Sequence, residues 1–263
     1  MTENHKEYEY EEIKCGDAIV TQAKDYLLPT GKVLILRTND KNNRAYGGFQ
    51  WPQQGLVEAP DWSSAAMCGR GLHGALWGVG DASLLKWDAD AIWQVIEADE
   101  SSVIDLGGKV KVPCAIVVHN GNRISSTSFI QEYTTGSLPV IGGTATAGNY
   151  GTATAGFKGT ATAGDEGTAT AGNYGTATAG NYGTATAGFK GTATAGNYGT
   201  ATAGNYGTAT AGNYGTATAG DEGVLIWRWW NGGRYEVTVV KINRENYMPN
   251  VGYKCTGGVI AEA

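Results

Sequence analysis

The feature that most constrains this chain is a tandem array of ten eight-residue repeats over residues 143–222. Each repeat reads Gly-Thr-Ala-Thr-Ala-Gly and then adds a variable pair, which is Asn-Tyr, Phe-Lys or Asp-Glu. Self-similarity at a short fixed period is the signature of a repeat architecture. The Thr-Ala-Thr-Ala run alternates with period two, which predicts a strand with one threonine face and one alanine face. The glycines on either side of the variable pair permit positive φ, so the pair is predicted to form a turn.

Two repeats are predicted to form each coil of a two-sided β-solenoid. Eight extended residues span at most ~26–28 Å, which is too short to close around inward side chains. Sixteen residues give a flattened coil with two strands, so ten repeats make about five coils. Alanines then meet between two sheets, and threonines cover both outer faces. A flat antiparallel meander is the alternative, but nothing would cover its shallow alanine face.

Coils of sixteen residues sort the variable pairs onto two edges. Tyr182, Tyr198 and Tyr214 then form a stacked ladder on one edge. Lys158 and Lys190 lie two coils apart on the other edge, so these like charges are never adjacent at the ~4.8 Å strand spacing. The predicted binding surface consists of turn tyrosines and strand threonines, namely Tyr174, Tyr182, Tyr198, Tyr206, Tyr214, Thr184, Thr186, Thr192 and Thr194.

The array divides the chain into three predicted parts. These are a small α+β N-terminal domain (1–136), the solenoid (137–222) and a C-terminal β cap (223–263), which together make a mostly β protein. In the cap, Leu225 and Trp227 fall where the repeats place inward alanines, so this strand is predicted to plug the core. Asn231-Gly232-Gly233 predicts a tight turn into a second strand at 235–242, which completes a hairpin.

The N-terminal domain has ordinary globular composition. Strands are predicted at 32–38, 92–97 and 110–119, and a short helix at 17–26. Five tryptophans are expected to be core or half-buried residues, with stacking on a carbohydrate or base as the alternative: Trp51, Trp62, Trp77, Trp87 and Trp93.

The densest chemical cluster is Cys-Gly-Arg-Gly-Leu-His-Gly at 68–74. Its glycines predict a tight loop, with His73 bonded internally. The functional alternative is a pocket in which Arg70 and His73 meet an anion or nucleotide. Zinc is a third option, because the Cys68-x4-His73 spacing recurs as Cys114-x4-His119. The second pair lies five residues apart in one predicted strand and hence on opposite faces, so we expect no metal site. No nucleotide-binding or hydrolase signature is present, and no cofactor is expected.

Charge, hydropathy and cysteine content disfavour several classes of partner and location. The formal net charge of −6 disfavours nucleic acid as the main partner. No stretch approaches the ~18–20 apolar residues of a membrane span, and the N-terminus lacks the pattern of a signal peptide. Four scattered cysteines suit free thiols, and therefore a cytoplasmic location, better than a disulfide framework.

Motifs across nearly the whole chain resemble an uncharacterised bacterial and phage family that joins such a domain to tandem octapeptides and an RWW-type cap. The motifs are Gly48–Pro52 (GFQWP), Pro60-Asp61-Trp62, the cluster at 68–74, Trp77-Gly78 and Asp105–Val110. The repeats are also similar to ice-nucleation proteins and insect antifreeze solenoids, in which outward Thr-x-Thr rows order water. The order of strands and loops resembles ADP-ribosyltransferase-like folds.

These features support three functional hypotheses. The first is a non-enzymatic binding or scaffold protein that associates with a protein partner or with itself, as a homodimer formed through the solenoid. The second, implied by the transferase resemblance, is a nucleotide-dependent transferase using Arg37, Arg70, His73 and Glu97. The third is binding of ice or ordered water by the threonine faces.

Overall fold

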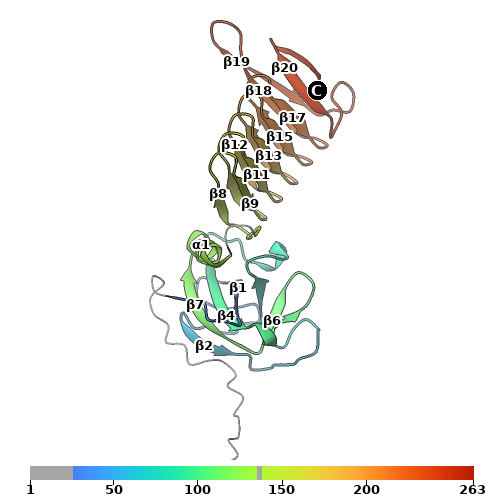
Figure 1. Ribbon diagram of the computed structural model, residues 1–263. Coiled ribbons are helices and arrows are strands. Elements are labelled where there is room, and N and C mark those ends of the chain that lie inside the picture. The colour runs from blue at the N-terminus through green and yellow to red at the C-terminus, as the bar shows by residue number, and fades with distance from the viewer. Residues whose placement is uncertain (1–25, 135–137) are drawn as a thin grey trace, which may run out of the picture.

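Two β-rich parts, an N-terminal sheet domain and a repeat solenoid with its cap, make up the computed structural model of the chain (Figure 1). The structure describes residues 26–134 and 138–263, so all but the last residue of the helix predicted at 17–26 lies outside the described residues. Within these ranges no helix is long and apolar enough to cross a membrane. The predicted fold class, a mostly β protein with a two-sided solenoid, is confirmed.

A seven-stranded antiparallel sheet forms the N-terminal domain, in the order β2-β7-β4-β1-β3-β6-β5. Its central strands β1 and β4 pair over eight residues each. The strands are β1 (Lys32–Asn39), β2 (Gly55–Glu58), β3 (Leu72–Leu76), β4 (Ile92–Asp99), β5 (Ile104–Asp105), β6 (Val110–Val112) and β7 (Cys114–Gly121), with 3-10 turns at Ala82–Leu84 and Glu100–Ser102.

Side chains alternate between the two faces of this sheet. On one face Leu34, Leu36 and Trp93 pack against Phe129 and Ile130 of helix α1 (Arg123–Tyr133). On the other face a second core forms around Trp51 and the buried side chains of β3, β6 and β7. The sheet therefore has two separate cores, and a residue's position along a strand decides which core it joins.

Several elements of this domain differ from the prediction: β2, β3 and β5 were not predicted, and β3 begins at Leu72 within the loop predicted at 68–74. The strand predicted at 110–119 is split at Pro113, which has no N–H to donate to a ladder. Its halves separate, because β6 pairs with β3 whereas β7 pairs with β4. Helix α1 was not predicted, although Asn122 and Ser125 form a reciprocal capping box at its start.

The ten repeats form ten short parallel strands, β8 to β17, that alternate between two sheets. Each strand pairs in register with the strand sixteen residues away, so that Thr176 lies beside Thr192 and Ala177 beside Ala193. The predicted coil of two repeats is thereby confirmed and the meander is rejected. The strands are β8 (Thr144–Thr146), β9 (Thr152–Ala155), β10 (Thr160–Thr162), β11 (Thr168–Ala171), β12 (Thr176–Ala179), β13 (Thr184–Ala187), β14 (Thr192–Ala195), β15 (Thr200–Ala203), β16 (Thr208–Ala211) and β17 (Thr216–Ala219).

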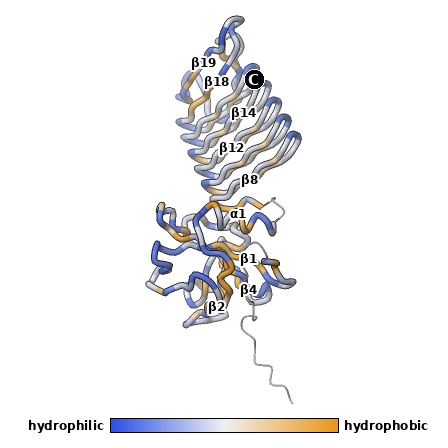
Figure 2. The backbone as a smooth tube through the Cα atoms, turned by 90° about the vertical axis from the view of Figure 1, so that its left-hand side faces the viewer, coloured by the Kyte–Doolittle hydropathy of each residue, from blue (hydrophilic) through white to orange (hydrophobic). Residues whose placement is uncertain are grey.

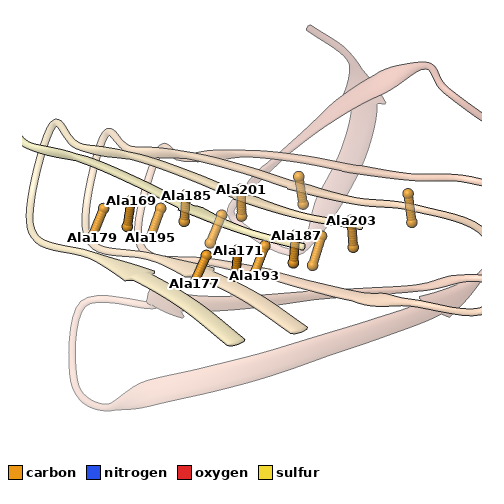
Figure 3. Close-up of a cluster of buried hydrophobic side chains, with 14 of the residues drawn as sticks. Ala169, Ala171, Ala177, Ala179, Ala185, Ala187, Ala193, Ala195, Ala201 and Ala203 are labelled. Atoms are coloured by element: carbon orange, nitrogen blue, oxygen red, sulfur yellow. The ribbon is translucent and has the colours of Figure 1, made fainter. Parts of the chain in front are cut away.

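Alanine methyl groups from the two sheets face one another and form the whole interior of the array (Figure 3). Ala185 and Ala193, for example, are fully buried, whereas the threonines beside them face outward. The tube in Figure 2 is most hydrophobic within the N-terminal sheet, and hydrophilic residues follow the edges of the coils. The predicted assignment of alanine to the inside and threonine to the outside is confirmed.

The turns differ in one respect from the prediction. Positive φ occurs at the second variable residue, for example Tyr182 at 58° and Lys190 at 51°, and not at the repeat glycines. The glycines serve a different purpose, since a Cβ at Gly196 would lie 2.7 Å from the backbone nitrogen of Asn181 in the coil before. Close approach of neighbouring coils, and not φ, therefore requires glycine at these positions.

The cap continues both sheets beyond the last repeat. Strand β18 (Val224–Trp230) pairs with β16 in the repeat register, and Leu225 and Trp227 are fully buried where alanines would lie, as predicted. It forms the predicted hairpin with β19 (Tyr235–Lys241). A second hairpin, which was not predicted, covers β17 in the other sheet and consists of β20 (Gly252–Thr256) and β21 (Val259–Glu262).

The first coil is joined to the N-terminal domain by several contacts. Arg123 of α1 donates hydrogen bonds to the carbonyl oxygens of Gly142 and Lys158, at 3.1 and 3.3 Å. The ring of Phe157 lies 5.4 Å from that of Trp87, and the Lys158 ammonium lies 4.4 Å from the same indole. The domain therefore covers the open end of the alanine core.

Candidate functional site

The two outer faces of the solenoid are regular grids of threonine. Along each strand the two threonines are two residues apart, which is ~6.6 Å, and neighbouring strands of a sheet are ~4.8 Å apart. In-register pairing repeats this spacing without a shift from β8 to β16 on one face and from β9 to β17 on the other. Each face therefore presents hydroxyl and methyl groups at fixed positions.

One edge of the solenoid carries the predicted tyrosine ladder. The rings of Tyr182 and Tyr198 are stacked, with centroids 5.0 Å apart and planes 5° apart. Tyr198 and Tyr214 continue the stack at 5.1 Å. These rings remain about half exposed, so the ladder is a flat aromatic strip open to solvent.

The opposite edge is more varied. There Phe157, Tyr174, Phe189 and Tyr206 follow one another at 5.4 to 5.7 Å in tilted or edge-on contacts. The Lys190 ammonium lies 5.8 Å from the Tyr206 ring and 5.9 Å from the Tyr174 ring, within the range of a cation–π contact. This edge lacks a continuous flat strip.

The first residue of most variable pairs supports the backbone of the next coil. The Asn181 side-chain oxygen accepts a hydrogen bond from the backbone N–H of Asn197 at 2.9 Å, and Asn197 repeats this contact to Asn213. Equivalent bonds are accepted by Asn149, Asp165, Asn173 and Asn205. The first variable residues therefore form a ladder of hydrogen bonds that links successive coils.

The solenoid residues predicted to bind lie on four separate surfaces. Thr184 and Thr186 belong to β13, whereas Thr192 and Thr194 belong to β14 in the opposite sheet. Tyr182, Tyr198 and Tyr214 share one edge through their stacking, and Tyr174 and Tyr206 share the other through Phe189. The structure therefore offers two faces and two edges, and no single patch contains all nine residues.

The N-terminal domain contains a cavity of about 650 Å³ beside strands β1 and β3. Its wall includes three of the four residues named for a transferase, namely Arg37, Arg70 and His73. Glu97 does not line it, because this side chain lies on the α1 face and accepts a hydrogen bond from Tyr26 at 2.5 Å. The strand register, which the sequence does not reveal, separates Glu97 from the other three.

A basic group next to a thiol also lies on this wall. The Lys109 ammonium is 2.9 Å from the Cys68 sulfur, and this contact lowers the pKa of the thiol. Sequence inspection named Cys68 only as a zinc ligand and did not name Lys109. The glycine-rich sequence around Cys68 was the feature that could have indicated a site there. Lys109 lies far away in the sequence, and the turn between β5 and β6 brings it to the thiol.

Three of the four residues considered for zinc, Cys68, Cys114 and His119, have other partners. His119 lies 3.0 Å from the Ser125 hydroxyl and stacks on Phe129. Cys68 and Cys255 are free thiols as expected, but Cys114 is disulfide-bonded, so the expectation of free cysteines is wrong there. No group of three or more potential ligands gathers in the described ranges.

Comparison with known proteins gives two kinds of match. The model of a domain of unknown function (DUF7666) matches residues 33–132. An ice nucleation protein of Pseudomonas syringae is 44% identical over 101 residues, which is 38% of this chain and 8% of that protein. Ice nucleation protein InaU of Pantoea ananas is 41% identical over 104 residues, which is 39% of this chain and 10% of that protein. An ice nucleation protein of Xanthomonas campestris pv. translucens is 35% identical over 113 residues, which is 42% of this chain and 7% of that protein.

The chain thus spans a tenth or less of the length of these relatives. No solved structure matches it. The chain is a β-solenoid repeat protein with partial similarity to ice nucleation proteins, joined to a domain that the family model covers.

Proposed function

We propose that the solenoid is a rigid binding module whose threonine faces hold an ordered layer of water and so bind ice. The observation that carries this proposal is the in-register alignment of threonine rows across five coils on both faces. A surface with hydroxyl groups at two fixed spacings holds water at fixed positions, and the alanine core behind it keeps the grid rigid. The similarity to ice nucleation proteins supports the same function.

Ice-growth measurements on the full chain test this proposal. Thr184→Tyr on β13 and Thr176→Tyr on β12 each place a bulky ring on one face, because these strands belong to opposite sheets. We expect thermal hysteresis and ice shaping to weaken in each variant and to vanish in the double variant. Ser101→Tyr, in the 3-10 turn Glu100–Ser102 of the N-terminal domain, is the control because this exposed residue lies outside the solenoid, and it should behave like the unchanged protein. Absence of any effect of the unchanged protein on ice at high concentration would contradict the proposal.

The tyrosine ladder favours a second function, which is association with another copy of the chain. Its flat and half-exposed rings are a self-complementary surface, and a two-fold dimer is the commonest closed oligomer. Such pairing would join two solenoids and enlarge the threonine grid, so this scaffold role is compatible with binding ice.

Sedimentation velocity at high micromolar concentration tests self-association. We expect a dimer, which Tyr198→Asn should convert to a monomer because it interrupts the ladder with a residue that tolerates positive φ. Tyr206→Asn makes the same change on the opposite edge and should leave the dimer intact. A monomer at every concentration of the unchanged chain would overturn this second proposal.

A further inference from the structure

Arg37 is a buried cation with no anionic partner among the described residues of the N-terminal domain. The residue is only 6% exposed, yet none of the ion pairs within residues 26–134 and 138–263 includes it. One terminal nitrogen donates to the Asn39 side-chain oxygen at 2.6 Å, and Nε has no hydrogen-bond partner among the described residues. Burial lowers the pKa of the guanidinium, which shows how unfavourable its surroundings are for a charge. An unpaired buried charge is costly, so a guanidinium in these surroundings would be stabilised by an anionic ligand.

The position of Arg37 is fixed from two sides. Its guanidinium carbon lies 3.2 Å from the centre of the Trp51 ring, so the indole supports one face of the group. Asn39 is held in turn by Gln94, whose amide donates to the Pro52 carbonyl and to Asn120. The guanidinium is thus oriented before any ligand arrives, which reduces the entropy lost on binding.

The cavity beside Arg37 has the electrostatic character that an anion needs. Its lining contains four basic side chains, Arg37, Arg70, Lys86 and Lys109, against two acidic ones, Asp61 and Asp81. Asp81 accepts a hydrogen bond from the backbone N–H of Ser83. His73 adds a buried Nε2 that has no partner within the described residues. The two residues that carry these unpartnered nitrogens, Arg37 and His73, therefore both line one cavity.

The remaining wall is largely apolar. Phe49, Trp51, Leu72, Leu84 and Leu85 line the cavity, whose volume of about 650 Å³ suits a small organic molecule. We propose that this cavity binds a small organic anion with an apolar body, whose carboxylate or phosphate group is held by Arg37. The site is independent of the threonine faces, because it lies within the N-terminal domain.

The N–H at Nε of Arg37 gives a direct readout in the full-length protein. Its NMR signal is assigned by its loss in Arg37→Lys and is followed during titration with benzoate, phenyl phosphate and neutral benzyl alcohol. We expect a saturable shift with at least one anion and none with the alcohol. A shift with benzoate alone identifies a carboxylate site, and a shift with phenyl phosphate alone identifies a phosphate site.

Matched variants separate binding from folding. Arg37→Gln keeps a hydrogen-bond donor for Asn39 but removes the charge. It should weaken anion affinity, measured for all variants by isothermal titration calorimetry, about 10- to 100-fold, the value of one charge-assisted hydrogen bond. The anion affinity of Arg37→Lys should lie between that of the unchanged protein and that of Arg37→Gln. Lys254→Gln, on the distant cap, should bind the anion like the unchanged protein. The proposal is overturned if neither anion moves the Arg37 signal, if the alcohol moves it equally, or if a folded Arg37→Gln variant binds with unchanged affinity.

Discussion

The last residue of every octapeptide turn joins an unfavourable backbone geometry to a displayed side chain. Its φ lies between 51° and 61° in all ten turns, although the residue is tyrosine, lysine or glutamate and never glycine. This conformation costs a non-glycine residue roughly 1–2 kcal/mol. Repetition of that cost indicates that the side chain itself is needed, for ring stacking or for charge on the edges of the solenoid.

Glycine at the start of each turn should be irreplaceable for a steric reason. A Cβ at Gly196 would come within 2.8 Å of the Asn181 side-chain oxygen. We expect Gly196→Ala to lower the free energy of unfolding by about 1–3 kcal/mol, measured by urea denaturation. Gly233→Ala is the matched control, since the nearest atom to its new Cβ is 3.8 Å away. Equal stability of both variants would show that neighbouring coils are less closely packed than described.

The alanine core gives a second prediction at the residue scale. Ala185→Leu adds three carbons to a position that is fully buried between two sheets, and should cost about 1–3 kcal/mol or more. Thr184→Val changes only an outward hydroxyl and should alter stability by about 0.5 kcal/mol or less. Thermal unfolding of the full chain measures both changes. A tolerated Ala185→Leu together with a damaging Thr184→Val would mean that the two faces are reversed.

Among the elements, the repeat strands were predictable and several others were not. Period-two alternation and an eight-residue repeat were enough to predict the strands and their pairing, because identical repeats must pack against one another in the same way. Helix α1 was missed because four of its residues, at 125–128, are serine or threonine, which favour helices weakly. Its support is tertiary, through the burial of Phe129 and Ile130 and the bond from Ser126 to the Trp93 carbonyl.

The candidate cavity was also predicted only in part, because it too depends on tertiary contacts. Arg37, Arg70 and His73 were named from the sequence, whereas Trp51 was expected to be a core or half-buried residue, with stacking on a carbohydrate or base as the alternative, and Lys109 was not named. Glu97 was grouped with Arg37, although the register pairs it with Leu34 on the other face of the sheet. Register depends on long-range pairing, which a single sequence does not reveal.

The cap strand β18 should contribute strongly to stability through one side chain. Trp227 continues the row of inward alanines and is fully buried, so Trp227→Ala should cost about 3–5 kcal/mol. Trp230, on the same strand, is 48% exposed and makes an edge-on ring contact with Tyr235. Trp230→Ala should therefore cost about 1 kcal/mol. Chemical denaturation of the two variants measures the difference, and similar losses would argue against the core role of Trp227.

Across the whole molecule, mild acid should affect the two parts differently. Burial lowers the pKa of His73 and of His119 below the usual 6.5, and both residues lie in the N-terminal domain. The unfolded chain then binds protons that the folded domain resists, so stability is full above pH 6.5 and falls as the pH decreases toward the folded values. The array at 143–222 contains no histidine and should be insensitive in this window.

Hydrogen exchange at pH 7.5 and pH 5.5 measures this difference. Amides of β4 should lose protection at the lower pH, after correction for intrinsic exchange rates, whereas those of β13 should not. A double variant, His73→Gln with His119→Gln, should reduce the loss in β4. Equal loss of protection in both strands would indicate that the solenoid and the domain unfold as one unit.

Because two repeats complete one coil, whether the number of repeats is even or odd determines which of the two sheets the cap strand β18 joins. Insertion or deletion of sixteen residues would change only the length of the solenoid, since β18 would still pair with the strand sixteen residues before it in the same sheet. A change of eight residues would transfer β18 to the opposite sheet and turn the cap by half a revolution relative to the N-terminal domain. The hairpins that contain β19 and β21 would then lie on opposite sides of the solenoid from those they occupy now. Each turn residue beyond the insertion would move to the other edge and contact different neighbours. Duplication within the gene is therefore neutral for the geometry of the two ends only when it adds repeats in pairs.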